Sequence, residues 1–565
     1  MAQDWYQIKD ELQQQVQGGL DDPMVWSNLA YAHLRCGDAP QARLAAEHAL
    51  GLDANHVGAW VNLGASHLQA GRLEEAEGAS RKVLSLAPDD AESYLFDSHV
   101  AREAGMINRA QQALLQAVRL DPSLADAWSQ LALTQMDLGL SVQALNAIER
   151  AMALEPQRLR YHSNRLMIAQ YHPELDSTAL RKMAEQFGRS VQVEVMPPLA
   201  PRESEQPIKV AYLGPDFRAH PVGYILRDVI ASHDPEHVEA SIWNLHRGSD
   251  WLSDEYRALP LEWHDVVGHS DKALAQAIRD AGIDVLVDLA GHTAHNRLGV
   301  IARRPARVQL SFLGWFGAIG VPGLDGLLMG ADQLTPGHEH AFAEPVLSLP
   351  GSHFRYRRLP YAPEIPNEEA DGPLRLACFN NTAKLQPEVI DAWAEILREL
   401  PQSELELRWK TLSDPHVCQS LLRRFQAAGI SAEQLVLRGA CSLQELLAAY
   451  RDVHIALDPF PFSGGMTSLE ALSMGVPVVT LAQLRAVSRQ THSMLRALDL
   501  EELSCERVKD YVDRAVSLGR DHGYRRDLRR KLINGFADSM LGDSRSLADE
   551  LARCYRELLA RREGR

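Results

Sequence analysis

The chain of 565 residues is long enough for three or four domains, and 45% of its residues are hydrophobic, so several cores can form. Its formal net charge of -17 argues against nonspecific binding to nucleic acid or to an anionic membrane. The six cysteines are scattered without a CxxC pair, which argues against a disulfide framework and a zinc site. The N-terminus lacks an apolar signal core and no apolar run reaches membrane length, so we expect a cytoplasmic protein.

A period of 34 residues runs through the first third of the chain. Three kinds of position keep it: aromatic residues at 26, 60, 94 and 128, glycines at 37, 71, 105 and 139, and alanines at 42, 76, 110 and 144. This period is typical of tetratricopeptide repeats, an α-solenoid in which the glycine separates two helices and the alanine lets them approach. We expect an N-terminal helix within 1–22, four repeats over 23–156, and a capping helix (about 157–187) with a linker to residue 206. Stacked repeats bind extended polypeptide, although a structural spacer is the alternative.

A first α/β lobe is predicted over 207–370. Strands are expected at 208–213, 238–243, 283–289, 308–312 and 326–329, with helices at 224–233 and 273–281. His220 lies in the loop after the first strand, where an imidazole can act as a base, or merely cap the next helix. Arg297 and the glycine-rich loop with Gly317 and Gly320 are candidates for contact with a sugar or an acceptor. His292 and His295 are expected to be structural.

A second α/β lobe is predicted over 371–540, followed by a C-terminal helix within 541–565. Its strands are expected at 374–379, 405–409, 435–438 and 453–457. Lys384 lies in the loop after the first of them and can neutralise a diphosphate. The alternative is a solvated surface lysine, which is the commoner place for this residue type.

The stretch 457–480 reads as a strand, a glycine-bearing loop, a helix and another strand. The start of a helix presents free backbone N–H groups and a partial positive charge to an anion. The expected donor-binding residues of this stretch are Ser463, Gly464, Gly465, Met466, Thr467, Ser468 and Glu470. The hydroxyls would add donors for a phosphate, and the carboxylate would bind a ribose hydroxyl. An ordinary turn between a strand and a helix is the alternative.

Three motifs, PDFRAHPVG (215–223), FNNTAKLQP (379–387) and LDPFPFSGGMTSLEALSMGVPVVT (457–480), resemble those of the O-GlcNAc transferase / SPINDLY family, glycosyltransferase family 41. The resemblance is nearer to the bacterial SPINDLY-like branch, covers nearly the whole chain, and implies a GT-B fold with two Rossmann-like lobes. It also implies an active-site histidine at His220, a donor-phosphate lysine at Lys384 and a donor contact at Asn381. Residues 465–467 match a family triplet of which only Thr467 is retained, and Leu443 stands where animal enzymes place a base-contacting lysine.

The resemblance implies an inverting protein O-glycosyltransferase that moves a sugar to serine or threonine of a protein acceptor, with GlcNAc from UDP-GlcNAc as the expected donor. Lys384 and the helix start would balance the charge of the leaving diphosphate. Because no strand-end Asp-x-Asp is present, we expect neither a metal nor a cofactor. The expected partners are the nucleotide sugar and a protein or peptide held by the repeats, not nucleic acid or a membrane. Three alternatives remain: O-fucosylation from GDP-fucose, transfer to an asparagine amide, and an inactive scaffold.

Overall fold

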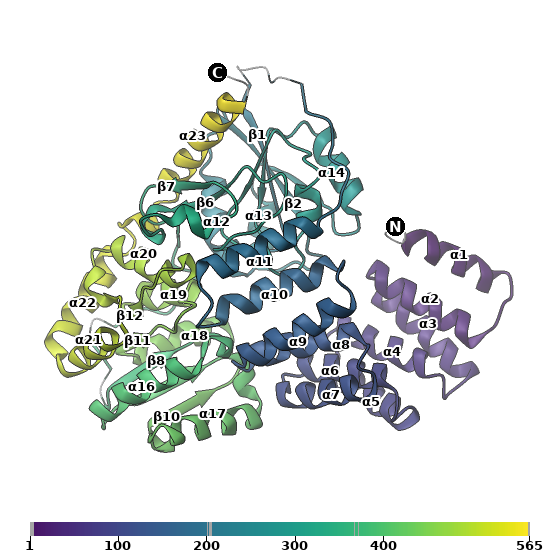
Figure 1. Ribbon diagram of the computed structural model, residues 1–565, viewed down its shortest axis with the longest axis horizontal. Coiled ribbons are helices and arrows are strands. Elements are labelled where there is room, and N and C mark those ends of the chain that lie inside the picture. The colour runs from purple at the N-terminus through teal and green to yellow at the C-terminus, as the bar shows by residue number, and fades with distance from the viewer. Residues whose placement is uncertain (1–4, 201, 203–205, 367, 371, 563–565) are drawn as a thin grey trace. The chain divides into compact units, whose positions relative to one another are not determined.

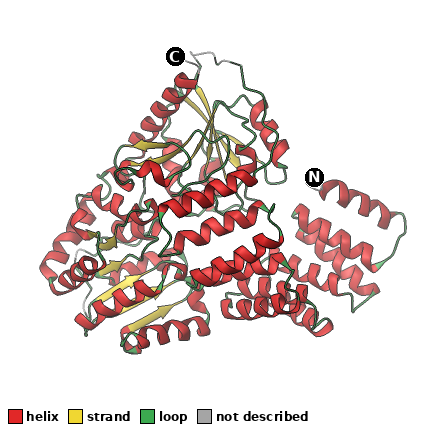
Figure 2. Cartoon of the chain, in the orientation of Figure 1, coloured by secondary structure: helices red, strands yellow, loops and turns green. Residues whose placement is uncertain are grey.

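The computed structural model describes residues 5–200, 202, 206–366, 368–370 and 372–562. It divides into two compact units: Met1–Pro156 with Lys410–Gln419, and Gln157–Trp409 with Ser420–Arg565. The described N-terminal part is helical, and the first strand starts at Ile208 (Figure 2). The predicted lobe boundary at Asp371 and part of the predicted linker (201 and 203–205) lie outside the described residues.

The first unit contains the predicted repeats (Figure 1). One helix, α1 (Trp5–Gln17), is followed by four pairs: α2 (Pro23–Cys36) and α3 (Ala39–Leu52), α4 (Val57–Gln69) and α5 (Leu73–Leu86), α6 (Ala91–Glu103) and α7 (Ile107–Leu120), and α8 (Ala125–Asp137) and α9 (Ser141–Leu154). The turn within each pair contains one of the periodic glycines, with φ between 71° and 78°. This left-handed conformation explains why glycine recurs there. The periodic alanines are 0% exposed, as expected where two helices meet closely.

The periodic tryptophans stabilise the turns between repeats. The indole N–H of Trp60 donates to the carbonyl of Ala54 at 2.9 Å, and that of Trp128 donates to the carbonyl of Pro122 at 3.0 Å. Each indole therefore satisfies a carbonyl in the turn that precedes its own helix. This hydrogen bond explains why tryptophan, an aromatic residue with a polar N–H, occurs at positions 60 and 128.

Two helices, rather than the single capping helix expected at 157–187, begin the second unit. They are α10 (Leu159–Tyr171) and α11 (Ser177–Ser190). Pro173 cannot continue a helix, and the Asp176 carboxylate caps α11 by accepting from the N–H of Ala179 at 2.7 Å. Leu166 and Phe187 are buried in the core of the first α/β lobe, so both helices belong to that lobe.

The first α/β lobe is a seven-stranded parallel sheet in the order β3-β2-β1-β4-β5-β6-β7. Its strands are β1 (Ile208–Gly214), β2 (Val238–Asn244), β3 (Glu262–Asp265), β4 (Val285–Asp288), β5 (Val308–Ser311), β6 (Gly326–Gly330) and β7 (Val346–Leu349). Its helices are α12 (Pro221–Ala231), α13 (Trp251–Arg257), α14 (Asp271–Asp280) and α15 (Leu298–Ile301). The short strands β3 and β7 were not expected, because at the sheet edges they lack a continuous apolar run.

The second lobe is a six-stranded parallel sheet in the order β10-β9-β8-β11-β12-β13. Its strands are β8 (Arg375–Cys378), β9 (Glu404–Arg408), β10 (Leu435–Arg438), β11 (Ile455–Leu457), β12 (Val478–Leu481) and β13 (Ser504–Cys505). The remaining helices are α16 (Pro387–Glu399), α17 (Pro415–Ala427), α18 (Leu443–Ala449), α19 (Met466–Ser473), α20 (Gln490–Arg496), α21 (Val508–Arg520), α22 (His522–Gly535) and α23 (Ser544–Arg562). An α-solenoid followed by two Rossmann-like sheets confirms the predicted GT-B fold class.

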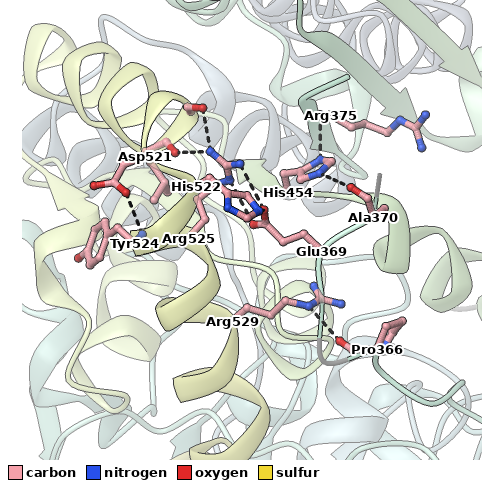
Figure 3. Close-up of polar contacts among 12 residues, drawn as sticks. Pro366, Glu369, Ala370, Arg375, His454, Asp521, His522, Tyr524, Arg525 and Arg529 are labelled. Atoms are coloured by element: carbon pink, nitrogen blue, oxygen red, sulfur yellow. Dashed lines mark hydrogen bonds and ion pairs between the residues drawn. The ribbon is translucent and has the colours of Figure 1, made fainter. Parts of the chain in front are cut away.

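The segment between the lobes is fixed to the second lobe by charged residues (Figure 3). The guanidinium of Arg525 forms two hydrogen bonds with the Glu369 carboxylate, at 3.1 and 3.2 Å, and His522 contacts the same carboxylate at 3.2 Å. The imidazole of His454 lies 3.1 Å from the carbonyl of Ala370. A bidentate pair of this kind fixes geometry as well as charge. It therefore anchors the segment between the lobes to the second lobe, just before the first strand of that lobe.

Candidate active site

The two predicted site loops both lie where the strand order of their sheet reverses. In the first sheet β1 lies between β2 and β4, and the loop with His220 follows β1. In the second sheet β8 lies between β9 and β11, the loop with Lys384 follows β8, and the loop 458–465 follows β11. Open parallel sheets bind ligands at the carboxyl ends of the strands at such a switch point. The topology therefore supports a site at these loops.

The carboxylate of Asp458 organises the glycine loop that leads into α19. It accepts from the N–H of Gly464 at 2.6 Å and from the hydroxyl of Thr480 at 2.6 Å. Burial raises the pKa of Asp458, and the hydrogen bonds with Thr480 and Thr491 act in the opposite direction. Sequence reasoning missed this residue, although an aspartate directly after a buried strand is a recognisable signal.

Lys384 is buried against the same loop. Its ammonium group donates to the carbonyl of Ser463 at 2.7 Å and lies 4.5 Å from the centre of the Phe462 ring. Burial lowers the pKa of Lys384 to about 8, while the nearby Asp458 acts to raise it. The structure therefore does not support the alternative of a solvated surface lysine. It places a cation beside the loop at the start of α19.

The N-terminus of α19 is open. Gly465 occupies the capping position and provides no side-chain hydrogen bond. Among the described residues, the backbone N–H groups of Gly465, Met466 and Thr467 find no hydrogen-bond acceptor. Unpaired N–H groups at a helix start attract an anion such as a phosphate.

Two of the expected hydroxyl donors serve the loop itself. The Ser463 hydroxyl donates to the carbonyl of Val487 at 2.8 Å, and the Ser468 hydroxyl lies 2.8 Å from that of Thr491. Both serines are buried, so their side chains hold the loop in place and are not free for a phosphate. The expected contact of Ser463 and Ser468 with a donor stays a prediction, and it would have to compete with these hydrogen bonds.

Asn381 lies in the loop after β8, and Thr467 lies in the first turn of α19. The side chain of Asn381 accepts from the N–H of Ala383 at 3.0 Å and so shapes the turn that carries Lys384. The neighbouring amide of Asn380 donates to the Thr467 hydroxyl at 2.9 Å, which joins the loop after β8 to the start of α19. Sequence reasoning did not single out Asn380, because an asparagine in a loop has many ordinary uses.

His220 is the N-cap of α12, so the helix-capping alternative is part of its role. Its Nδ1 lies 3.4 Å from the N–H nitrogen of Val222 and 3.4 Å from a carboxylate oxygen of Asp216. Burial lowers the pKa of His220 to about 4, and the charge of Arg218 adds to this effect. Burial also raises the pKa of Asp216 to about 6. At neutral pH the site therefore contains a neutral imidazole beside a carboxylate that is mostly ionised.

Glu470 lies one turn inside α19 and is only 4% exposed. Burial raises its pKa to about 8. Among the described residues its Oε2 atom has no hydrogen-bond partner. A buried carboxyl oxygen without a donor is costly, and it is suited to receive a hydroxyl from a ligand.

The residues expected to contact a sugar or an acceptor pack against other parts of the first lobe. Arg297 binds Asp271 at 2.6 Å and the carbonyl of His269 at 2.7 Å. A Cβ on Gly320 would come within 1.9 Å of the backbone of α11 at Ala184, and one on Gly317 would come within 3.1 Å of the Gln170 side chain on α10. The glycines therefore let two helices approach, and the expected contact of this loop with a sugar or an acceptor stays a prediction.

His292 is structural, as expected. It is 2% exposed, and its Nε2 lies 2.8 Å from the carbonyl of Ile319. Within the described residues, no three His, Cys, Asp or Glu side chains are grouped to hold a metal ion. The helices of the described ranges include none that is both long and apolar enough to cross a membrane.

Comparison with known proteins identifies relatives of both parts of the chain. The model of "Glycosyl transferase family 41" matches residues 161–354 and 370–551. A tetratricopeptide-like model, "Cilia and flagella-associated protein 70 middle TPR-like domain", matches residues 2–100. Among solved structures, a point mutant of the O-GlcNAc transferase from Thermobaculum terrenum is 32% identical, with a TM-score of 0.85. That similarity covers 90% of this chain and 98% of the bacterial one.

Curated plant proteins share the same region. A probable UDP-N-acetylglucosamine–peptide N-acetylglucosaminyltransferase SPINDLY from Solanum lycopersicum is 29% identical over 70% of this chain and 44% of its own length. The protein of the same name from Arabidopsis thaliana is 30% identical over 63% of this chain and 40% of its own length. The chain thus spans less than half the length of these curated relatives.

Proposed function

Because the chain belongs to glycosyl transferase family 41, we propose that it is a protein O-glycosyltransferase that moves GlcNAc from UDP-GlcNAc to serine or threonine. One observation supports the donor half of this proposal most directly. Lys384 and the open N–H groups of residues 465–467 lie together at the switch point of the second sheet. Positive charge beside unpaired donors suits the diphosphate of a nucleotide sugar.

The proposed reaction is an inverting displacement. The acceptor hydroxyl oxygen bonds to the anomeric carbon as the bond from that carbon to the diphosphate oxygen breaks. The nucleoside diphosphate leaves with the electron pair, and the acceptor hydroxyl loses its proton. Lys384 and the start of α19 stabilise the charge that develops on the leaving oxygen, since preorganised donors act without solvent rearrangement. This source of positive charge is why we propose that no metal ion is needed.

The proposed acceptor site includes the four repeats. Helical repeats of this type stack into extended surfaces that bind polypeptide. The donor-binding and catalytic candidates all lie in the second unit, so the two tasks are separated along the chain. We propose that the repeats add binding area for the protein acceptor and do not take part in the chemistry.

A chain that lacks residues 1–156 is expected to keep donor hydrolysis and to show a raised KM for a protein acceptor. The truncation keeps α10 and α11, because Leu166 and Phe187 on these helices complete the core of the first lobe. Initial rates over a range of acceptor concentrations, with circular dichroism as the control for folding, provide the measurement. An unchanged acceptor KM would identify the repeats as a spacer.

The donor is tested by incubating the full chain with acceptor proteins and a panel of nucleotide sugars in excess EDTA. We expect nucleotide release and labelled serine or threonine with UDP-GlcNAc, at a rate that EDTA does not change. Release with GDP-fucose alone would identify the O-fucosyltransferase alternative. Turnover that EDTA abolishes and Mn²⁺ restores would contradict the metal-independent mechanism. The absence of turnover with every donor would favour the inactive scaffold.

A further inference from the structure

A cavity of about 810 Å³ lies where the two lobes, the segment between them and the C-terminal helix α23 meet. The far ends of two helices line it, α12 at Asp228 and Ser232 and α19 at Ser473. The rest of the lining comes from the segment between the lobes, from the end of α22 and from the start of α23. Asp228 follows His220 by eight residues, and Ser473 follows Met466 by seven. At about 1.5 Å per residue, the cavity is therefore roughly 10 Å away from the candidate active site at the helix starts.

The wall formed by the segment between the lobes is fixed by hydrogen bonds. The backbone N–H of Tyr356 donates to the carbonyl of Leu541 at 2.8 Å, and the guanidinium of Arg355 donates to the carbonyl of Asp543 at 2.7 Å. Arg355 is 3% exposed, and its other acceptors are also backbone carbonyls. Because carbonyls carry no net charge, the positive charge of this guanidinium remains behind the wall.

The phenol hydroxyl of Tyr356 lacks a partner in this cavity. Tyr356 lines the cavity and is only 3% exposed, and among the described residues its hydroxyl has no hydrogen-bond partner. A buried hydroxyl without a partner costs free energy, and native structures rarely retain one without a reason. Since a phenol can donate a hydrogen bond, an anion in the cavity would satisfy it.

The arginines of the lining differ in their partners. Arg357 pairs with the carboxylates of Asp228 at 3.0 Å and Glu255 at 3.2 Å, so its charge is balanced within the protein. Arg358, in contrast, forms no ion pair with a carboxylate in the described ranges, and its guanidinium donates to the carbonyl of Pro363. Arg358 therefore provides a cation at the cavity that a ligand can pair with.

The other charged groups of the lining are already balanced. The carboxylate of Asp543 caps α23 by accepting from the N–H of Ser546 at 3.0 Å. Arg545 pairs with Asp549 at 3.2 Å along the same helix. Glu364 is exposed, so water solvates its carboxylate. These groups therefore do not cancel the attraction of the cavity for an anion.

The remaining part of the lining is apolar and includes Ile365, Ile533 and Phe536. The ring of Phe536 is 5% exposed, and its centroid lies 6.3 Å from that of the Tyr356 ring in an edge-to-face arrangement. Ligand sites typically combine an apolar lining with a few polar groups that fix the orientation of the ligand. A ligand that complements this cavity therefore has an apolar body as well as an anionic group.

We propose that this cavity binds a small organic anion, with a phosphate or carboxylate group at Tyr356 and Arg358 and an apolar body against Phe536. The inference goes beyond the proposed function and does not depend on it, since among the described residues neither His220 nor Lys384 lines the cavity. The bound anion contacts both lobes and the segment between them, so its binding favours the arrangement of the lobes described here.

Calorimetric titration of the full-length protein with phenyl phosphate, a phosphate on an apolar ring, tests the proposal without donor or turnover. We expect a Kd of about 1 mM, in keeping with the size of this probe. Arg358→Gln removes the charge and Tyr356→Phe removes the hydroxyl, and we expect them to weaken binding about 10-fold and about 5-fold. The matched controls, Arg530→Gln and Tyr524→Phe, make the same changes on α22 outside the lining and should bind within about twofold of wild type.

The same titrations in a Lys384→Met background separate the cavity from the candidate active site, which also attracts phosphate. We expect the loss caused by Arg358→Gln to persist in that background. If the loss disappeared there, or if Arg358→Gln and Tyr356→Phe bound phenyl phosphate as wild type does, the cavity would not be the binding site. The absence of binding to wild type at about 10 mM, ten times the expected Kd, would also overturn the proposal.

Inorganic phosphate tests the apolar half of the site. It cannot contact Phe536 while its oxygens bind Tyr356 and Arg358, so we expect it to bind wild type at least about tenfold more weakly than phenyl phosphate. Equal affinity for the two probes would overturn the assignment of an apolar body. Because no probe here is a nucleotide sugar, a failure of glycosyl transfer would leave these results unchanged.

Discussion

Replacing Lys384 with alanine is expected to lower kcat by about 10²- to 10³-fold, as does the loss of one preorganised donor to a developing negative charge. The ammonium group of Lys384 is buried at the carbonyl of Ser463, beside the unpaired N–H groups that start α19. In that position it acts on the leaving diphosphate more strongly than a solvated lysine could, because water does not screen it. The measurement is the steady-state rate of nucleotide release with the full-length protein.

The controls for this prediction separate charge from packing. Lys384→Met keeps the length of the side chain without its charge, and it should lose about as much activity as Lys384→Ala. Lys509→Ala removes an exposed lysine on α21 that pairs with Asp513, and it should have wild-type activity. Rates for Lys384→Ala within about threefold of wild type would remove Lys384 from the mechanism. Unchanged circular dichroism would show that the loss does not come from unfolding.

The lowered pKa of Lys384 predicts that kcat/KM depends on pH. Because its pKa is about 8 in the free protein, the side chain is charged below that pH and neutral above it. The charged form is the one that stabilises a leaving diphosphate, so kcat/KM is expected to fall as the pH rises through about 8. In Lys384→Met this alkaline decline should be absent.

The repeats and both lobes could be predicted because their signals are local and periodic. Gly71 and Ala76, for example, recur at one spacing because each repeat needs a left-handed turn and a close helix contact at the same place. Parallel strands such as β1 and β11 are short apolar runs next to loops. The lysine and the glycine loop could be placed for a similar reason, since both follow buried strands.

The features that could not be predicted depend on contacts between distant segments. Gly320 has the same local signal whether a sugar or a helix approaches it, and only the fold shows that Ala184 of α11 does. The position of Ser463 alone makes it a candidate to donate to a phosphate, but its hydroxyl donates to the carbonyl of Val487. Tertiary contacts of this kind leave no trace in spacing or composition.

Replacing His220 with alanine is expected to lower kcat by about 10²- to 10³-fold, because we assign this imidazole as the base that takes the acceptor proton. Its Nδ1 has two neighbours at 3.4 Å, the N–H of Val222 and the carboxylate of Asp216, and a neutral ring can satisfy only one of them. An ionised Asp216 favours a proton on Nδ1, which leaves the lone pair of Nε2 free for the acceptor hydroxyl. A protonated Asp216 favours the other tautomer, in which Nε2 carries the proton and cannot act as a base.

Because the tautomer of His220 depends on the charge of Asp216, we expect protonation of Asp216 to set the acid limit of activity. Burial raises the pKa of Asp216 to about 6 and lowers that of His220 to about 4, so the carboxylate is the group that titrates first as the pH falls from neutrality. The kcat/KM of wild type should therefore decline below pH about 6. In Asp216→Asn the activity should be low and nearly independent of pH from about 5 to 7. The control His522→Ala removes an exposed imidazole whose partner, the Glu369 carboxylate, is still held by Arg525, and it should leave the wild-type profile. If His220→Ala kept nearly full activity, or if Asp216→Asn kept the acid decline, the imidazole would only orient the acceptor or the sugar.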